Sequence, residues 1–450
     1  MKIILKPIAG SVTAPRGFLA SGVFCDIKRL GTGKGSNKGK KRDLALIFSE
    51  VPAAVAGMFT TSRVCAAPVK VSLPRARGNR ARAIVVNSGN ANACTGIRGL
   101  RDAREMAAVV AKICRVPAES VLMASTGRIG VHLPMANVRK GIQAATAILN
   151  NSPENAHHAA EAIMTSDTRP KEIAVEFELG GQTVRIGGIC KGAGMIQPGM
   201  SPTGARPASV PSGGLHATML CFLTSDAAIE SRTLQSALTG AVANSFNRIT
   251  VDGDMSTNDT VILLANGIAK NPRLVAAKNR SRSGDLATFQ AALNHVCLEL
   301  AKMIVRDGEG VTRFVTVRVS GAKTAADAEA AARAVANSSL VKTSWFGGDP
   351  NWGRILGALG YSDAVHIVEE KIDVAYSVPG GSKLLYALKK GQPTAATFDI
   401  LCKTAALKEF DLHINLNLGK AKAVIYAGDL TEEYVEFNKG DVSDPASLGG

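Results

Sequence analysis

The apolar residues of this chain follow two spacings in turn. Short apolar runs at residues 82–87, 218–223 and 260–265 predict strands, the first of them buried. Apolar residues three and four positions apart predict helices, at residues 101–115, 137–148, 154–166, 231–246, 285–305 and 325–337. This alternation of strands and helices predicts an α/β or α+β protein built from layers.

Other segments depart from these two spacings. Residues 173–179 and 182–189 flank Gly180 and Gly181, which predicts a β-hairpin. A further strand is predicted at 313–319, and alternating polar and apolar residues predict a half-exposed strand at 410–418. Residues 271–284, rich in Lys, Arg and Ser, are interpreted as a surface connector. Residues 201–216 hold three Pro and three Gly, which excludes a helix or a central strand and predicts a loop.

Length and composition place the chain among folded proteins. With 450 residues it is long enough for two or three substructures. Hydrophobic residues make up 46% and aromatic residues 4%, which is ordinary for a soluble α/β protein and argues against disorder. We find no apolar run long enough to cross a bilayer, and residues 1–6 are too short for a signal-peptide core. We therefore expect a cytoplasmic protein with no membrane partner.

The net charge of +16 is unevenly distributed. Residues 1–217 hold 29 Lys and Arg against 12 Asp and Glu, whereas residues 218–450 hold 24 against 25. The densest basic run, at 34–42, is rich in Gly and Ser and has no aromatic residues on which bases could stack. We interpret it as a solvated loop, with attraction of small anionic substrates as the alternative, and expect no nucleic-acid partner.

The cysteines and histidines do not have metal-ligand spacing. There is no Cys-x-x-Cys pair, and the adjacent His157 and His158 do not share one face of a helix. We predict no metal, and reduced, mostly buried thiols. The eight cysteines are Cys25, Cys65, Cys94, Cys114, Cys190, Cys221, Cys297 and Cys402.

Thr218 is the candidate nucleophile. A threonine hydroxyl is a weak nucleophile and needs a neighbouring base. If the bond between Ala217 and Thr218 is cut, Thr218 gains an α-amino group, whose ordinary pKa of about 7.7–8.0 suits it to take the hydroxyl proton. Taken alone, Ala-Thr-Met-Leu is also an ordinary start for a buried strand.

A series of motifs favours the nucleophile over an ordinary strand start. They are NSGNANACTG at 87–96, STGRIG at 125–130, MTSDTRPK at 164–171, KGAGMI at 191–196, ATML at 217–220, DGD with STNDT at 252–260, DGEG at 307–310, DPNWGR at 349–354 and YVEFN at 434–438. With these motifs in this order, the chain resembles the ornithine acetyltransferase (glutamate N-acetyltransferase) family of the arginine pathway over nearly its full length.

The resemblance implies a fold and a processing event. The expected fold is a helix–sheet–sheet–helix sandwich of the self-processing N-terminal-nucleophile type, with a smaller C-terminal α/β domain. Cleavage between Ala217 and Thr218 would leave residues 1–217 and 218–284 completing the sandwich together, with residues 285–450 closing the substrate pocket. The two chains would stay associated and are expected to form a heterotetramer.

The resemblance also implies acetyl transfer from N2-acetylornithine to glutamate through an acetyl-threonine intermediate. Thr218 would be the nucleophile, with its α-amino group as general base, and Thr126 and Gly127 would form the oxyanion hole. No cofactor is implied, and acetyl-CoA is an alternative donor. The residues expected to contact substrate are Thr165, Lys191, Thr218, Glu309, Asn438 and Ser443.

The chemistry suits these roles. An oxyanion needs preorganised donors, and Gly127 lets a backbone N–H approach closely while Thr126 adds a hydroxyl. Both substrates carry an α-carboxylate, for which Lys191 supplies a positive charge. We infer that Glu309 faces the side-chain ammonium that only ornithine carries.

Two features depart from the family pattern. Family members run from a Pro-x-Met segment directly into Ala-Thr-Met-Leu, whereas here residues 201–216, including His216, intervene. The tail also extends past the matched end, at residues 444–450. Two other functions stay open: a related self-processing amidase or aminopeptidase that gives the acyl group to water, and an uncleaved basic protein that binds RNA or an enzyme.

Overall fold

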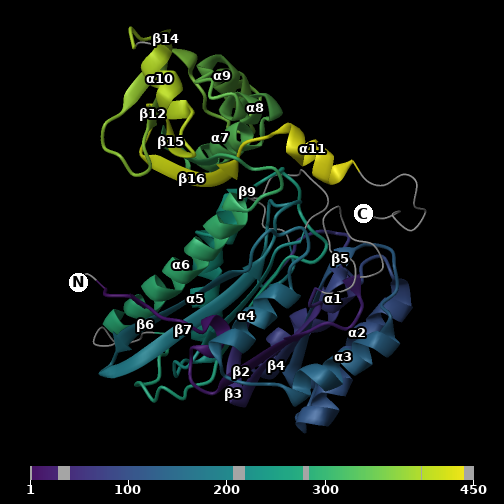
Figure 1. Ribbon diagram of the computed structural model, residues 1–450. Coiled ribbons are helices and arrows are strands. Elements are labelled where there is room, and N and C mark those ends of the chain that lie inside the picture. Colours follow the sequence, from purple (N-terminus) through teal and green to yellow (C-terminus); the bar gives the residue numbers. More distant parts are fainter. Residues whose placement is uncertain (1–2, 29–40, 206–217, 277–282, 397, 440–450) are drawn as a thin grey trace.

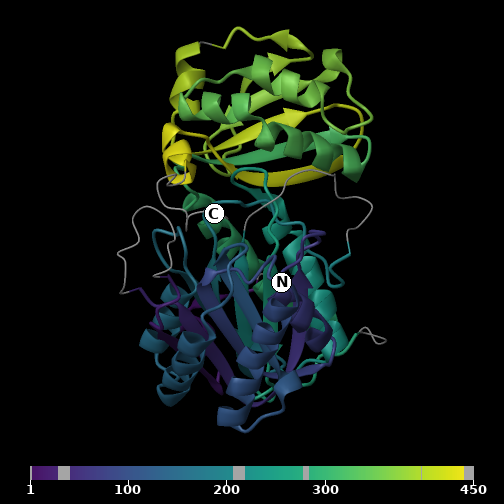
Figure 2. The same cartoon turned by 90° about the vertical axis from the view of Figure 1, so that its right-hand side faces the viewer.

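The computed structural model describes residues 3–28, 41–205, 218–276, 283–396 and 398–439. These residues form two bodies, each built on one sheet, and Figures 1 and 2 show the smaller body stacked on one end of the larger. Most of the basic run at 34–42 and of the loop at 201–216 lies outside the described residues.

The larger body contains a nine-stranded sheet in the order β1-β6-β7-β8-β10-β3-β4-β5, with β2 paired to β3. Its strands are β1 (Lys6–Pro7), β2 (Phe18–Val23), β3 (Leu44–Phe59), β4 (Arg80–Asn90), β5 (Val121–Arg128), β6 (Lys171–Leu179), β7 (Gln182–Lys191), β8 (Leu220–Ser225) and β10 (Thr260–Ala265). The predicted hairpin is confirmed, because β6 and β7 pair antiparallel from Leu179 and Gln182 onward.

The long strand β3 belongs to both halves of this sheet. Its first part pairs with β2 and β4, and residues 54–59 pair with β10, with a shift in register between Phe48 and Ala53. The two halves face each other, because Phe222 of β8 shares one buried cluster with Ile47 of β3 and Ile84 of β4. The sheet is thus folded into two layers.

Helices cover both outer faces, which confirms the predicted sandwich. The neighbours Cys221 and Leu223 of β8 point away from the inner cluster, because successive side chains on a strand point to opposite faces. They pack in the layer that contains α5 (Ser231–Ala243) and α6 (Ser283–Arg306). The opposite outer layer contains α2 (Gly96–Cys114) and α3 (Met135–Ala147). Two shorter helices complete the body: α1 (Ala67–Ala76), which packs on β5, and α4 (Pro153–Ala162), which packs on β2.

The smaller body has a seven-stranded sheet in the order β14-β13-β12-β15-β11-β16-β9. Its strands are β9 (Ile249–Thr250), β11 (Phe314–Ala322), β12 (Asp373–Ser377), β13 (Leu385–Lys389), β14 (Gln392–Pro393), β15 (Glu409–Asn415) and β16 (Ala421–Gly428). Its helices are α7 (Ala325–Asn337), α8 (Ser339–Phe346), α9 (Trp352–Gly360) and α10 (Phe398–Ala405), and α11 (Glu432–Asn438) follows the last strand. Sheet and helices share one core around the buried Trp345 and Tyr376.

The two bodies are joined more closely than the predicted segments suggest. Strand β9 follows α5 in the chain but pairs with β16 of the second sheet. Helix α6 packs on β6 and β7, so the segment predicted to begin at residue 285 starts with a helix of the first body. In the order of elements, the change from one body to the other falls between Arg306, the last residue of α6, and Phe314, the first residue of β11.

Three smaller expectations need correction. The strand predicted to be half-exposed at 410–418 is mostly buried, because it runs inside the second sheet and its polar Asp411 pairs with Arg318. The helix predicted at 154–166 ends at Ala162, where the backbone N–H of Thr165 instead donates to the Asp167 carboxylate. All eight thiols are free, but they are less buried than expected: Cys190, Cys221 and Cys297 are buried, and Cys94 is exposed.

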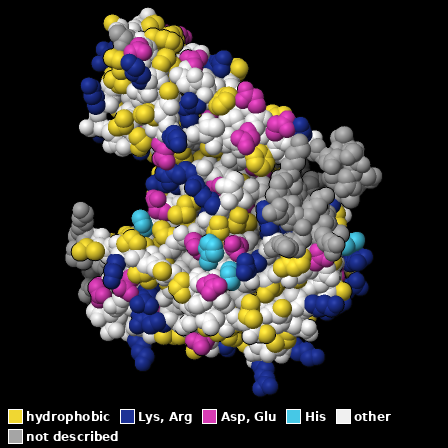
Figure 3. Space-filling view, viewed as in Figure 1, with side chains coloured by type: hydrophobic (Ala, Val, Ile, Leu, Met, Phe, Trp, Pro, Cys, Tyr) yellow, Lys and Arg dark blue, Asp and Glu magenta, His cyan; other side chains and the backbone are white. Residues whose placement is uncertain are grey.

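Over the part of the chain that the structure describes, no helix is long and apolar enough to cross a membrane. On the face shown in Figure 3, Lys and Arg are interspersed with Asp and Glu, and the surface is hollowed between the two bodies.

Candidate active site

Three segments converge where Thr218 enters strand β8. Lys191 at the end of β7 pairs in register with Leu220, because β7 and β8 are antiparallel. Thr260 at the start of β10 also pairs with Leu220, because β8 and β10 are parallel. The loop before β10 therefore lies beside Thr218, as does the end of β7.

The hydroxyl of Thr218 is hydrogen-bonded to Ser256. The two side-chain oxygens are 2.8 Å apart, and either can be the donor. Ser256 is itself held in place: its Oγ accepts from Asn258 N at 2.8 Å, and its carbonyl accepts from Thr60 Oγ1 at 2.5 Å. The sequence motifs predict no role for Ser256, although it lies in the STNDT motif.

Asp259 fixes the same loop through hydrogen bonds to its backbone. Its carboxylate accepts from the backbone N–H groups of Met219, at 2.9 Å, and Ser256, at 3.2 Å. The side chain is buried, and burial raises its pKa to about 7, although these two hydrogen bonds act in the opposite direction. One carboxyl group thus fixes the backbone on both sides of the Thr218–Ser256 pair.

Lys191 connects another predicted residue, Thr165, to Thr218. Its Nζ donates to Thr165 Oγ1 at 2.7 Å and to the Thr218 carbonyl at 3.0 Å, and lies 3.8 Å from the Asp167 carboxylate. The lysine is buried, and this burial lowers its pKa, while the negative charge of Asp167 opposes that effect. Thr165, Lys191 and Thr218, which the family resemblance predicts to contact substrate, therefore form one contact group.

A second buried lysine holds the surrounding turns together. Lys171 Nζ donates to Asp167 at 2.6 Å and also contacts Asp307, and Gly192 N donates to Asp167 at 2.7 Å. Burial alone would raise the pKa of Asp167, but the ammonium groups of Lys171 and Lys191 hold it below its usual range. The network ties the turn after α4 to the end of β7 and to the turn after α6.

Thr126 and Gly127 lie at the end of β5, beside β4. Gly127 has a φ of +124°, and a Cβ there would lie 2.4 Å from the carbonyl carbon of Gly89, so only glycine fits. Thr126 is buried. Asn258 connects this strand end to the nucleophile loop, because its Nδ2 donates to the carbonyls of Ser125, at 2.9 Å, and Ala91, at 2.8 Å.

Glu309 and Asn438 form the remaining part of the site. Asn438 Nδ2 donates to Glu309 Oε2 at 2.9 Å, and Glu309 N donates to the carbonyl of Ala193 at 2.9 Å. The carboxylate lies against Gly194, where an added Cβ would be 2.2 Å from Oε2. Glu309 is thus placed over the turn that follows Lys191. Ser443 and Ala217 lie outside the described residues.

The loop before Thr218 begins at an anchored position. Ser201 exchanges backbone hydrogen bonds with Phe59 of β3, at 2.9 and 3.0 Å. Residues 206–216, including His216, lie outside the described residues. Within the described part of the chain, no cluster of three or more His, Cys, Asp or Glu side chains could hold a metal ion.

The fold and this contact group define the class: a layered α/β protein whose candidate nucleophile is a threonine hydroxyl at the start of an inner strand. A model of the ArgJ family matches residues 27–440. The chain belongs to the ArgJ family, which confirms the family that the motifs predicted.

Individual relatives cover nearly the whole chain. It is 46% identical over 435 residues to the arginine biosynthesis bifunctional protein ArgJ of Symbiobacterium thermophilum, covering 96% of this chain and 98% of the relative. It is 44% identical over 439 residues to a glutamate N-acetyltransferase of Methanocaldococcus jannaschii, covering 96% and 99%. Among solved structures, a chain of ArgJ from Bacillus halodurans is 40% identical, with a TM-score of 0.41, and the match covers 45% of this chain and 100% of that one.

The raised pKa of Asp259 predicts a pH-dependent difference in stability. Asp259 keeps its proton to about pH 7 in the folded protein but only to about pH 4 in the unfolded chain, so its contribution to stability falls as pH rises between these values. Asp259→Asn loses one acceptor oxygen at every pH but carries no charge. We expect the variant to have a lower melting temperature than the unmodified protein at pH 5. The difference between the two melting temperatures should narrow towards pH 8.

Thermal melts at several pH values measure this difference. Asp399→Asn, at a side chain 72% exposed, serves as the control. If the melting-temperature difference between Asp259→Asn and the unmodified protein stays constant from pH 5 to 8, the pKa of Asp259 is not raised in the folded protein.

Proposed function

We propose that this protein is a glutamate N-acetyltransferase of arginine biosynthesis. It would move the acetyl group of N2-acetylornithine to glutamate through an acetyl ester on Thr218. The observation that carries the proposal is the contact group of Thr218, Ser256, Lys191 and Thr165 in a member of the ArgJ family. The names of the relatives, which include a glutamate N-acetyltransferase 44% identical to this chain, support it.

The proposal includes cleavage between Ala217 and Thr218, which frees the α-amino group that serves as base. The strand order supports continued association of the two products. Strands β8 and β10, which follow the bond, lie between β7 and β3, which precede it. Separating the fragments would break both of these strand pairings and the cores on both faces of the sheet, so the cleaved chains stay together.

The proposed reaction has two acyl transfers. The α-amino group of Thr218 takes the hydroxyl proton as Oγ attacks the acetyl carbonyl of N2-acetylornithine. The carbon–nitrogen bond then breaks, and the proton passes to the departing ornithine amine. In the second half, the amine of glutamate attacks the acetyl ester, and its proton returns to Thr218 Oγ. Thr126 Oγ1 and Gly127 N would stabilise the oxyanion in both halves.

Substrate recognition uses the charges around the nucleophile. Lys191 Nζ has three N–H donors, of which two bind Thr165 and Thr218, so one is left for the α-carboxylate that both substrates share. Glu309 would face the side-chain ammonium of ornithine, with Asn438 fixing the orientation of its carboxylate. Ser443 would join this group from the tail, as the family resemblance implies.

The direct test is an acetyl-exchange assay with purified protein. With N2-acetylornithine and glutamate together, we expect equal amounts of ornithine and N-acetylglutamate, measured by chromatography, and no exchange in Thr218→Ala. Repeating the assay with acetyl-CoA tests the second donor. Ornithine release that needs no glutamate would indicate an amidase, and an intact chain without turnover would favour a binding protein.

The Ser256 contact predicts a moderate loss of rate. Ser256→Ala removes the hydrogen bond to Thr218 Oγ1, and a neutral hydrogen bond contributes about 0.5–1.5 kcal/mol. We therefore expect kcat to fall by a factor of about two to ten, with a smaller change in KM. The control is Ser245→Ala, a buried serine that bonds to Ala241 within its own helix end. An unchanged kcat in Ser256→Ala would show that Ser256 does not position the nucleophile.

A further inference from the structure

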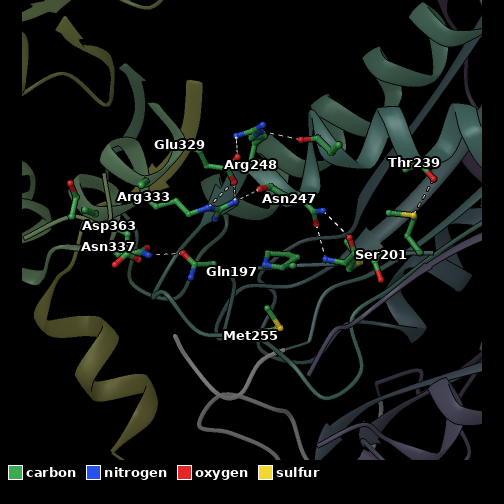
Figure 4. A pocket seen from close by; sticks show the side chains of 18 of the residues that line it. Gln197, Ser201, Thr239, Asn247, Arg248, Met255, Glu329, Arg333, Asn337 and Asp363 are labelled. Carbon is green, nitrogen blue, oxygen red and sulfur yellow. Dashed lines mark hydrogen bonds and ion pairs between the residues drawn. The ribbon is translucent and has the colours of Figure 1, made fainter. Parts of the chain in front are cut away.

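A cavity of about 530 Å³ lies between the two bodies, apart from the Thr218 contact group. Its walls come from the 197–202 segment, the end of α5, the α7 helix and residues 361–363 (Figure 4). Thr218, Lys191 and Thr165 do not line it. Met255 does, and the next residue, Ser256, binds Thr218. The cavity is thus adjacent to the site described above and separate from it.

One part of the cavity carries two arginines that share one carboxylate. Arg333 binds Glu329 Oε1 through Nε at 3.1 Å and Nη2 at 2.8 Å, and Arg248 Nη1 is 3.0 Å from Glu329 Oε2. Among the described residues, no hydrogen bond is donated by Arg333 Nη1 or Arg248 Nη2. Since two guanidinium groups meet one carboxylate, the cluster keeps a positive charge and unused donors for an anion.

A carboxylate lies at the same end of the cavity. Asp363 also lines it, and Figure 4 places its side chain on the side of Asn337 and Arg333. Asp363 is exposed and forms no ion pair or hydrogen bond with any described residue. This end of the cavity therefore offers unused guanidinium donors and a carboxylate without a partner among the described residues.

The rest of the lining combines apolar residues with the amides of Gln197, Asn247 and Asn337. Met58, Met200 and Met255 contribute thioether side chains, and Thr239, whose hydroxyl donates to Gln235 O at 2.8 Å, has its Oγ1 3.6 Å from Met58 Sδ. Methionine side chains adapt to aliphatic groups of different shape. The volume lies in the range of known small-molecule sites, and such sites combine apolar walls with a few placed charges.

We propose that this cavity is a second ligand site, which binds a free α-amino acid. Arg333 and Arg248 bind its carboxylate, Asp363 binds its ammonium group, and its side chain lies along the methionines. A simple anion would leave Asp363 without a partner, and a simple cation would leave the guanidinium donors unused. A zwitterion satisfies both.

Calorimetric titration of the full chain tests the site. The probes are L-leucine, L-glutamate and L-arginine, which differ in side-chain charge. We expect at least one of these amino acids to show a binding component that remains in Lys191→Met. The affinity of this component should weaken at least tenfold in Arg333→Gln and in Asp363→Asn. For that amino acid, the N-acetyl and the amide derivatives, which lack the ammonium or the carboxylate charge, bind at least tenfold more weakly. Arg318→Gln, outside the cavity, binds as the unmodified protein does.

Two outcomes would overturn the inference. In the first, no amino acid shows any binding other than the binding that Lys191→Met removes. In the second, a further binding component is present but is unchanged in both Arg333→Gln and Asp363→Asn. Asp363→Asn alters an exposed side chain, so its result stands even if Arg333→Gln fails to fold. If Lys191→Met leaves every component intact while the cavity variants remove one, the cavity site holds and the proposed role of Lys191 in substrate binding fails.

Discussion

The register of strands β7, β8 and β10 is the constraint on which the site depends. Leu220 pairs with Lys191 on one side and with Thr260 on the other, which places Thr218 between the end of β7 and the loop before β10. A shift of one residue would turn Phe222 out of the inner core and move Thr218 away from Lys191. The buried side chains on both faces of β8 therefore fix the position of the candidate nucleophile.

Buried charge then fixes the turns around that strand. An ammonium group inside a protein is costly unless carboxylates and hydrogen bonds surround it. Lys171 meets that need with Asp167 and Asp307, which lie on separate turns, so both turns must be in place for the lysine to form both of its ion pairs. Lys191 shares Asp167 and adds the contacts to the nucleophile. The electrostatic network and the strand register thus specify the same arrangement.

Much of the fold and of the candidate site could be predicted from the sequence wherever a local sequence signal exists. Helix α7 begins and ends where its pattern predicted, because Thr324 caps its first turn by accepting from Asp327 N. Strand β9 escaped prediction, because two residues carry no periodicity and its partner β16 is far along the chain. The role of Ser256 escaped for the same reason: it arises from a contact with Thr218, 38 residues away. The motifs identified Thr165 and Lys191 as candidate residues together with Thr218. The cavity at Arg333 could not be predicted, because its lining comes from both bodies and forms only when they are assembled.

The most direct test of the account is the mass of the protein after incubation with N2-acetylornithine in the absence of glutamate. We expect two fragments, of which the second begins at Thr218 and is heavier by one acetyl group on that residue. Added glutamate should remove the acetyl group. A single uncleaved chain without acetylation, or an acetyl group carried on a different residue, would contradict the account.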